Sequence, residues 1–135
     1  VGLSHSGWRG TVRKIGNVTI RKMIEEYGCD PEDILAAVGP SICQGCYEVS
    51  EDVIERVKDA FDRKYWDGLF YGKADGKYQL NLWEANRIVF LESGIQPAHI
   101  SMPNLCTCCN PELLFSHRAS HGKRGNLGAF LGLKK

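Results

Sequence analysis

The sequence predicts an α/β fold in which helices pack in layers against a mixed β-sheet. Segments with the apolar spacing of a helix alternate along the chain with short apolar runs that are typical of strands. Turn signals that contain glycine and proline separate these segments. Hydrophobic residues make up 43% of the 135 residues and charged residues 24%, which is enough apolar material for a core. The length and composition therefore fit one globular domain.

The first half of the chain is expected to contain two strands and two helices. Residues 1–4 are typical of a short buried strand, which a tight turn with two glycines follows. A helix is predicted over 11–27, and the glycine after it suits the usual helix end. The continuous apolar run 34–38 is typical of a strand covered on both faces. Ser50 is a good N-cap for a helix that continues to about residue 65.

The second half of the chain is expected to hold a hairpin, a helix and two further strands. An Asp-Gly pair separates the strand-like runs 69–71 and 77–80, which is a hairpin signal. Asn81 caps the next helix, and a glutamate stands three residues later, as in a capping box. Strands are predicted over 99–102 and near 129–133, with a cysteine-rich loop and a basic, glycine-rich segment between them.

Charge and hydropathy exclude several classes of partner. The formal net charge of +1 gives no basic field for nucleic acid. No apolar run approaches the roughly 20 residues that a membrane helix needs, and no signal peptide is visible. We therefore expect a cytoplasmic protein without nucleic-acid or membrane partners. Because the chain opens on strand-like residues without a methionine, we also expect it to be part of a larger domain.

The first candidate for chemistry is His5 together with the turn that follows it. His5 stands at the end of the expected strand, where open α/β folds bind ligands, and an imidazole there can bind Zn²⁺ or move a proton. Arg9 stands just before a helix N-terminus, where amide groups favour an anion such as phosphate. Trp8 could pack against a base or fill the core. The same residues also fit a plain strand-to-helix turn with a hydrogen-bonded histidine.

The second candidate is a pair of cysteine clusters. Cys43 and Cys46 have CxxC spacing, and so do Cys106 and Cys109, although Cys108 crowds the second pair. Two such pairs suggest a tetrahedral zinc site made of thiolates. The alternative is that the thiols are buried and inert, since free cysteine is among the most buried residue types. In either case an adequate core without an export signal favours reduced thiols over disulfides.

The third candidate is a short basic loop in the last part of the chain. It contains His117 and Arg118, followed by His121, Lys123 and Arg124. These cations could bind a phosphate or a nucleoside hydroxyl through charge-assisted hydrogen bonds. Composition alone also fits a solvated basic loop. Neither the P-loop motif nor the GxGxxG motif occurs, so P-loop and dinucleotide-binding functions are excluded.

Taken in order, these segments resemble the YfiH/YlmD family. The run His5–Gly10 resembles the family's His-Ala-Gly-Trp-Arg-Gly signature, with Ser6 in place of alanine. Residues 39–42 and 46–49 resemble its Gly-Pro-x-Ile and Tyr-Glu-Val motifs. The remaining matches follow in the same order along the chain: Leu82-Trp83 with Asn86, Cys106-Thr107, and Phe115-Ser116-His117-Arg118 with Gly125.

The resemblance implies a layered α/β fold that is compared with cysteine hydrolases, with residues 1–135 as the C-terminal part of a single domain. It also implies a catalytic zinc held by two histidines and one cysteine, with His5 as one of these ligands. The family's other two ligands lie in upstream motifs that this sequence does not contain, so none of its cysteines is assigned to the missing position. An upstream segment or another copy of the chain would then complete the site.

The activity that the resemblance implies is zinc-dependent phosphorolysis of adenosine, inosine, guanosine and methylthioadenosine, with some deamination of adenosine. In this interpretation His5 and Arg9 are catalytic, and Arg9, His117 and Arg118 bind phosphate or substrate. Two alternatives remain open: a non-catalytic cysteine-rich zinc module, and a copper phenol oxidase, which is the family's older description. The four scattered histidines are few for a multicopper site, because such sites rely heavily on imidazole ligands.

Overall fold

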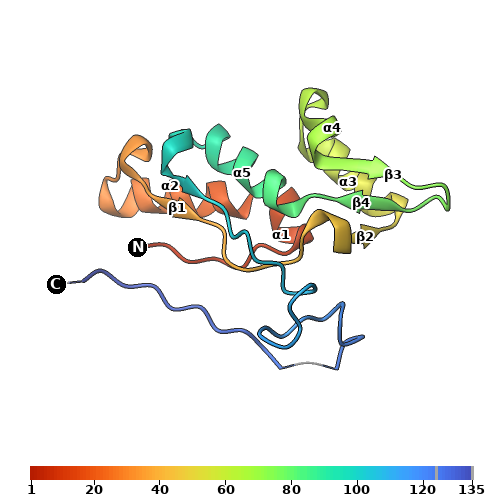
Figure 1. The fold of residues 1–135 in the computed structure, drawn as a ribbon. Helices are drawn as coiled ribbons and strands as arrows, with labels where there is room; N and C mark the ends of the chain where they lie inside the picture. Colours follow the sequence, from red (N-terminus) through yellow and green to blue (C-terminus); the bar gives the residue numbers. More distant parts are fainter. Residues whose placement is uncertain (124, 135) are drawn as a thin grey trace.

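The structure, a computed structural model, describes residues 1–123 and 125–134 (Figure 1). Helices and strands alternate along the chain, which confirms the predicted α/β class. The helices are α1 (Trp8–Val12), α2 (Ile15–Tyr27), α3 (Glu51–Ala60), α4 (Trp66–Leu69) and α5 (Leu82–Glu92). The strands are β1 (Ala36–Ala37), β2 (Glu48–Val49), β3 (Phe70–Gly72), β4 (Tyr78–Leu80) and β5 (Ile100–Ser101). None of the described helices combines the length and the apolar character that crossing a bilayer requires.

The strands form two small sheets. β2, β4 and β3 make an antiparallel sheet in that order, in which Phe70 lies opposite Leu80. β1 and β5 pair in parallel. The parallel pairing resumes beyond these strands as an isolated bridge between Ser41 and Cys106. Two segments that are far apart in the sequence therefore leave the parallel pair at the same end.

The core is formed by side chains from α3, α4, α5 and the antiparallel sheet. Ile54, Leu69 and Leu80 are 0% exposed. An apolar stripe that runs from the residue before Ser50 along α3 is also buried, and it consists of Val49, Val53, Val57 and Phe61. Burial of each such side chain contributes about 1.5–3 kcal/mol. α5 is the central helix, because it contacts α1, α2 and α4.

The first predicted helix is two helices instead of one. α1 and α2 meet at Lys14, whose backbone lies in the left-handed region with a φ of 56°. The Lys14 ammonium forms an ion pair with Glu92 of α5 at 2.8 Å and lies over the ring of Phe61. Within α2, a Cβ at Gly16 would lie 3.1 Å from Phe90 Cε1. The helix break at Lys14 and the glycine at position 16 therefore both lie where the chain packs against α5.

The hairpin and the helix after it are confirmed. β3 and β4 flank the predicted Asp75–Gly76 turn, whose glycine has a φ of 75°. Asn81 accepts a hydrogen bond from the backbone N–H of Glu84 at 3.0 Å, as an N-cap residue does. Ser50 also precedes its helix in the cap position, but its hydroxyl bonds to the Asp52 carboxylate instead of a backbone amide.

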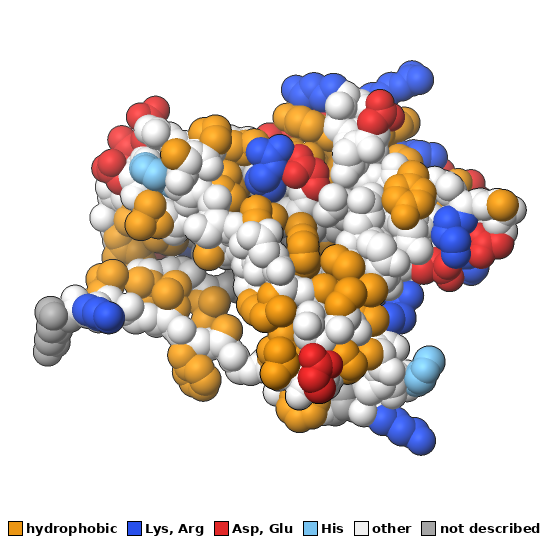
Figure 2. Space-filling model, in the orientation of Figure 1, with side chains coloured by type: hydrophobic (Ala, Val, Ile, Leu, Met, Phe, Trp, Pro, Cys, Tyr) orange, Lys and Arg blue, Asp and Glu red, His pale blue; other side chains and the backbone are white. Residues whose placement is uncertain are grey.

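Three of the predicted strands are wrong in part or in full. Residues 1–4 and 129–133 form no strand in the structure, and Phe130 is 98% exposed. The run 34–38 narrows to β1, and Leu35 is 79% exposed, so this strand is not covered on both faces. A strand needs a neighbour that completes its ladder of hydrogen bonds, and within the described residues β1 pairs with β5 alone. Figure 2 shows hydrophobic side chains gathered along the C-terminal segment.

Candidate functional site

The segment His5–Gly10 runs from exposed residues into α1, which already begins at Trp8, so Arg9 lies within the helix and not before it as predicted. Close contacts with His5 explain the two glycines of this segment. A Cβ at Gly7 would lie 3.2 Å from His5 Nε2, so the imidazole folds back over this glycine. A Cβ at Gly10 would lie 3.3 Å from the backbone carbonyl oxygen of His5. Because both contacts are tighter than an ordinary van der Waals approach, a larger residue at either position would displace His5.

Buried hydroxyl and amide groups fix this turn to α5. Ser6 Oγ donates to Asn86 Oδ1 at 2.8 Å, and Asn86 Nδ2 donates to the Leu82 carbonyl at 2.8 Å and to Thr11 Oγ1 at 3.3 Å. Thr11 Oγ1 in turn donates to the Gly7 carbonyl at 3.0 Å. Thr11 and Asn86 are buried. A buried polar network in which each member has partners holds the turn in one geometry.

Arg9 and Arg118, which were predicted to bind an anion, are placed around two aromatic side chains. The guanidinium carbon of Arg9 lies 4.6 Å from the centre of the Trp8 ring, and that of Arg118 lies 5.4 Å from the centre of the Tyr47 ring. Trp8, Tyr47 and Arg118 line a cavity of about 270 Å³. Trp8 and Arg9 line a second cavity of about 590 Å³. Trp8 lines both cavities, so it lies beside the cavity of Arg118 and beside that of Arg9.

Arg118 is fixed against β2 by its own hydrogen bonds. Its Nη1 and Nη2 atoms each donate to the Glu48 carbonyl oxygen at 3.0 Å. A guanidinium has five N–H donors, so these two bonds leave donors for a ligand. Burial raises the pKa of the neighbouring Tyr47 hydroxyl, and the charges of Arg118 and Arg9 oppose that rise. Both cations therefore act on one phenol, which remains a neutral hydrogen-bond donor near pH 7.

The predicted histidines lie apart from these cavities. Within the described residues, the lining of the two cavities includes neither His5 nor His117. His117 is exposed, and its backbone carbonyl accepts from the Gly122 N–H at 2.9 Å, which closes a turn of the basic loop. His121 lies in the same turn with a φ of 50°. Arg124 lies outside the described residues.

His5 by itself does not form the zinc site that the resemblance implies. Catalytic zinc sites use about three protein ligands. Among the described residues, no histidine belongs to a group of three or more side chains that could hold a metal ion. The His5 imidazole is exposed, so it is accessible to further ligands. The role of His5 as one of the two histidine ligands that the resemblance implies therefore stays a prediction.

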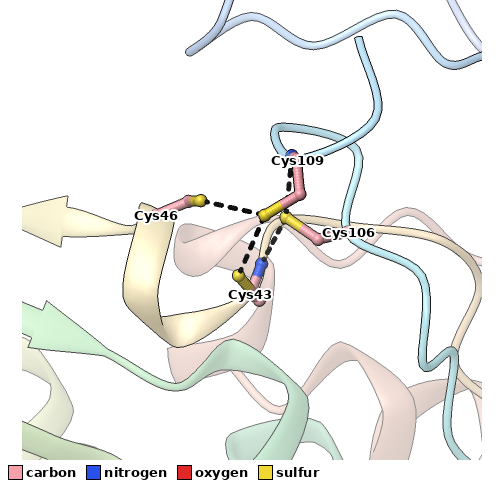
Figure 3. Close-up of side chains that lie close together, drawn as sticks. All are labelled: Cys43, Cys46, Cys106 and Cys109. Carbon is pink, nitrogen blue, oxygen red and sulfur yellow. Dashed lines mark hydrogen bonds between the residues drawn. The ribbon is translucent and has the colours of Figure 1, made fainter. Parts of the chain in front are cut away.

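Four cysteines converge where the parallel strands end (Figure 3). The Sγ atoms of Cys43, Cys46, Cys106 and Cys109 all lie within 4.8 Å of one another, and such a group could hold a metal ion. Cys46 Sγ lies 3.4 Å from Cys109 Sγ, and Cys43 Sγ lies 4.0 Å from it. All four thiols are free, as the sequence predicted. Of the four cysteines only Cys106 is buried, since Cys109 is exposed and the other two are partly exposed, so the alternative of buried thiols does not describe the group.

The pKa values of Cys106 and Cys46 shift in opposite directions. Burial acts to raise the pKa of Cys106, but the hydrogen bonds from the backbone N–H groups and then the side chains of Cys43 and Cys109 together outweigh burial and bring the pKa to about 6. The pKa of Cys46 is raised, chiefly by its hydrogen bond with Cys109 and then by burial. Cys106 therefore ionises more readily than Cys46.

Sequence reasoning gave no role to three residues that shape the site. Tyr47 lies within the Tyr-Glu-Val motif, so a signal existed, but nothing indicated that it would face two arginines. Asn86 also lies in a quoted motif, and its contact with Ser6 depends on the fold. Thr11 was assigned only to a helix start, and no local pattern distinguishes its buried hydroxyl from an exposed one.

The separate parallel and antiparallel sheets, the surrounding helices and the segment His5–Gly10 define an α/β domain of the YfiH/YlmD type. The family model described as multi-copper polyphenol oxidoreductase laccase matches residues 1–134. The chain therefore belongs to this family.

Similar proteins carry the names of nucleoside enzymes. The purine nucleoside phosphorylase YlmD of Bacillus subtilis (strain 168) is 38% identical over 135 residues, which is 100% of this chain and 48% of that protein. The adenosine deaminase RL5 of an unknown prokaryotic organism is 38% identical over 118 residues, which is 87% of this chain and 44% of that protein. The chain thus spans about half the length of the curated relatives it matches.

Solved structures agree with this assignment. The crystal structure of the Bacillus licheniformis hypothetical protein YfiH has a TM-score of 0.83 and 36% identity, covering 89% of this chain and 45% of that one. The crystal structure of YlmD from Geobacillus stearothermophilus also has a TM-score of 0.83, at 33% identity, covering 90% of this chain and 45% of that one. The predicted YfiH-like fold is therefore confirmed.

Proposed function

We propose that this chain is part of a purine nucleoside phosphorylase in which Arg9 and Arg118 bind phosphate. The observation that supports this most is the arrangement of the two arginines around Trp8 and Tyr47, beside two adjoining cavities. The planar fork of a guanidinium matches the oxygens of phosphate. An indole offers an apolar face for a purine. Relatives that carry the name purine nucleoside phosphorylase point to the same chemistry.

The side chains would act mainly by positioning and by charge. In phosphorolysis a phosphate oxygen attacks the anomeric carbon of the ribose, and the bond from that carbon to the purine nitrogen breaks. The electron pair of this bond leaves with the purine, which takes up a proton, and ribose 1-phosphate forms. Arg9 and Arg118 would hold the phosphate anion close to the anomeric carbon, and Trp8 would pack against the leaving base. His117, which is exposed beside Arg118, would contact a ribose hydroxyl.

We further propose that these residues form the C-terminal part of the catalytic domain. A preceding segment or another copy of the chain would then supply the ligands that join His5 around zinc. The support is that the chain matches 48% of YlmD and that the described residues offer only one ligand at this turn. Zinc bound there would polarise the substrate or activate a nucleophile. Cytoplasmic location belongs to the same proposal.

The phosphate role is tested in the full-length protein as its gene encodes it. We expect Arg9→Ala and Arg118→Ala each to raise the KM for phosphate in inosine phosphorolysis by about 10- to 100-fold, because a charged hydrogen bond contributes about 1.5–3 kcal/mol. Arg21→Ala is the matched control, since the Arg21 side chain is exposed on α2 and pairs with Glu25 at 3.7 Å, away from both cavities among the described residues. An unchanged KM for phosphate in both variants would contradict the proposal.

Adenosine deamination is the second candidate function, because the relative RL5 carries that name. Ammonia release from adenosine, measured with and without phosphate, separates the two activities, since only phosphorolysis requires phosphate. The copper phenol oxidase alternative receives no support from the described residues, where no candidate metal group contains a histidine. The non-catalytic zinc module predicts metal without turnover, so activity with inosine and phosphate would exclude it.

A further inference from the structure

We propose that Cys43, Cys46, Cys106 and Cys109 form a structural zinc site that holds the basic loop in place. None of these ligands is His5, and the proposal does not depend on the phosphorylase activity. The site is built by the fold from two segments. Cys43 directly precedes the short 3₁₀ helix η2 (Gln44–Cys46), which comes after β1, and Cys46 is its last residue, whereas the other two cysteines follow β5.

The parallel strands explain why the two cysteine pairs meet. β1 and β5 run in the same direction, and the bridge between Ser41 and Cys106 carries the pairing up to the first ligand of the second pair. The Thr107 N–H donates to the Ser41 carbonyl at 3.2 Å, which holds the two loops together at that point. Loops that leave the same end of two parallel neighbours lie side by side. Each pair then keeps the CxxC spacing that brings two thiols to one metal ion.

The separations between sulfur atoms match tetrahedral zinc. A zinc–sulfur bond of about 2.3 Å requires the sulfur atoms of a tetrahedron to lie about 3.8 Å apart. The separations of 3.4 Å and 4.0 Å from Cys109 Sγ to Cys46 and Cys43 fall on either side of that value. A disulfide would need one pair at about 2.05 Å and would leave the other two thiols unused. Convergence of all four within 4.8 Å is therefore the pattern of a metal site.

Backbone amides supply the outer support that thiolate ligands need. The N–H of Cys43 donates to Cys106 Sγ at 3.2 Å, and the N–H of Cys109 donates to it at 3.4 Å (Figure 3). Such bonds stabilise the negative sulfur and orient the ligand. Four sulfur ligands select zinc or iron among the common metals, and they leave no position for water or substrate. We therefore assign a closed site with a structural role.

The bound zinc would position Arg118. Cys46 directly precedes Tyr47 and Glu48, and Glu48 provides the carbonyl that accepts both Arg118 hydrogen bonds. The segment from Cys109 to Arg118 is short. A metal ion that joins Cys46 to Cys109 would therefore fix both the Glu48 carbonyl and the Arg118 side chain that donates to it. Few apolar side chains are buried in this loop, so the metal would replace a hydrophobic core there.

Metal content of the full-length protein, purified with a reductant, tests the assignment. Because His5→Ala removes a ligand of the proposed catalytic zinc, we use it as the background. We expect that protein to retain about one zinc per chain. The further change Cys46→Ser or Cys109→Ser should remove this zinc, whereas Cys29→Ser and Cys108→Ser should retain it. Retention of zinc in both ligand variants would overturn the proposal.

Two measurements on the His5→Ala protein remain decisive if the cysteine variants fail to fold. X-ray absorption at the zinc edge should show a shell of sulfur atoms alone at about 2.3 Å. A shell of nitrogen and oxygen, iron in place of zinc, or a disulfide between Cys46 and Cys109 in the purified protein would each overturn the assignment. Chelation should also increase hydrogen exchange in residues 106–123 but not in α5, and equal protection before and after chelation would contradict the structural role.

Discussion

Two regions of this chain are ordered by different means. The helix–hairpin region, residues 48–92, buries a continuous set of apolar side chains from α3, β4 and α5. The cysteine loop region, residues 103–123, contains no helix or named strand. Its buried residues are Cys106, Thr107 and Ser116, so it buries a thiol and two hydroxyls where the first region buries hydrocarbon.

The difference shows that burial of apolar side chains does not stabilise the cysteine loop region. Its order depends on side-chain and backbone hydrogen bonds, such as that from Asn110 Nδ2 to the Cys106 carbonyl at 2.7 Å. The contact between Arg118 and Glu48 ties it to β2. Arg118, Cys106 and Cys109, which are among the residues proposed to bind phosphate or zinc, thus lie on a loop that a separate, rigid scaffold supports. Changes in the two regions should have different consequences for stability.

The largest expected effect is in the helix–hairpin region. Leu80→Ala should lower the free energy of unfolding by about 2–5 kcal/mol, because Leu80 is 0% exposed and its loss leaves a cavity. Leu113→Ala, the same change in the cysteine loop region, should alter it by less than about 0.5 kcal/mol, since Leu113 is 70% exposed. Urea denaturation of the full-length protein measures both. Equal losses would show that the loop has an apolar core of its own.

A smaller effect is expected where the His5 turn joins α5. Thr11→Val keeps the shape of the side chain but removes the acceptor of the Asn86 amide and the donor to the Gly7 carbonyl. We expect a loss of about 1–3 kcal/mol, because buried polar groups are left without partners. Thr19→Val is the control, since the Thr19 hydroxyl donates to the Ile15 carbonyl of its own helix. A loss at Thr19 as large as that at Thr11 would show that the network has no special role.

Local signals predicted the helix–hairpin region well. The Asp-Gly turn and the Asn81 cap each act over a few residues, and each is confirmed. The break at Lys14 was missed because it accompanies contacts with Glu92 and Phe61, which lie far along the chain. Propensity within the segment carries no information about such partners.

The candidate site depended more on contacts between distant segments. Two CxxC pairs could be recognised in the sequence, but their meeting depends on the parallel pairing of β1 and β5. Arg9 and Arg118 were both identified by charge, whereas their common neighbour Tyr47 required the fold. The strand predicted for residues 1–4 failed because an apolar run alone does not supply the neighbour that a strand needs.

The smallest effect compares two helix starts within the helix–hairpin region. Asn81→Ala should lower the free energy of unfolding by about 1 kcal/mol, because the side chain accepts from the Glu84 backbone N–H. Ser50→Ala should change it by less than about 0.5 kcal/mol, since the Ser50 hydroxyl bonds to Asp52 and caps no backbone amide. Sequence preference ranks serine and asparagine alike at this position. Equal losses in urea denaturation would mean that residue type at the cap matters more than the hydrogen bond it makes, and a larger loss at Asn81 would mean the reverse.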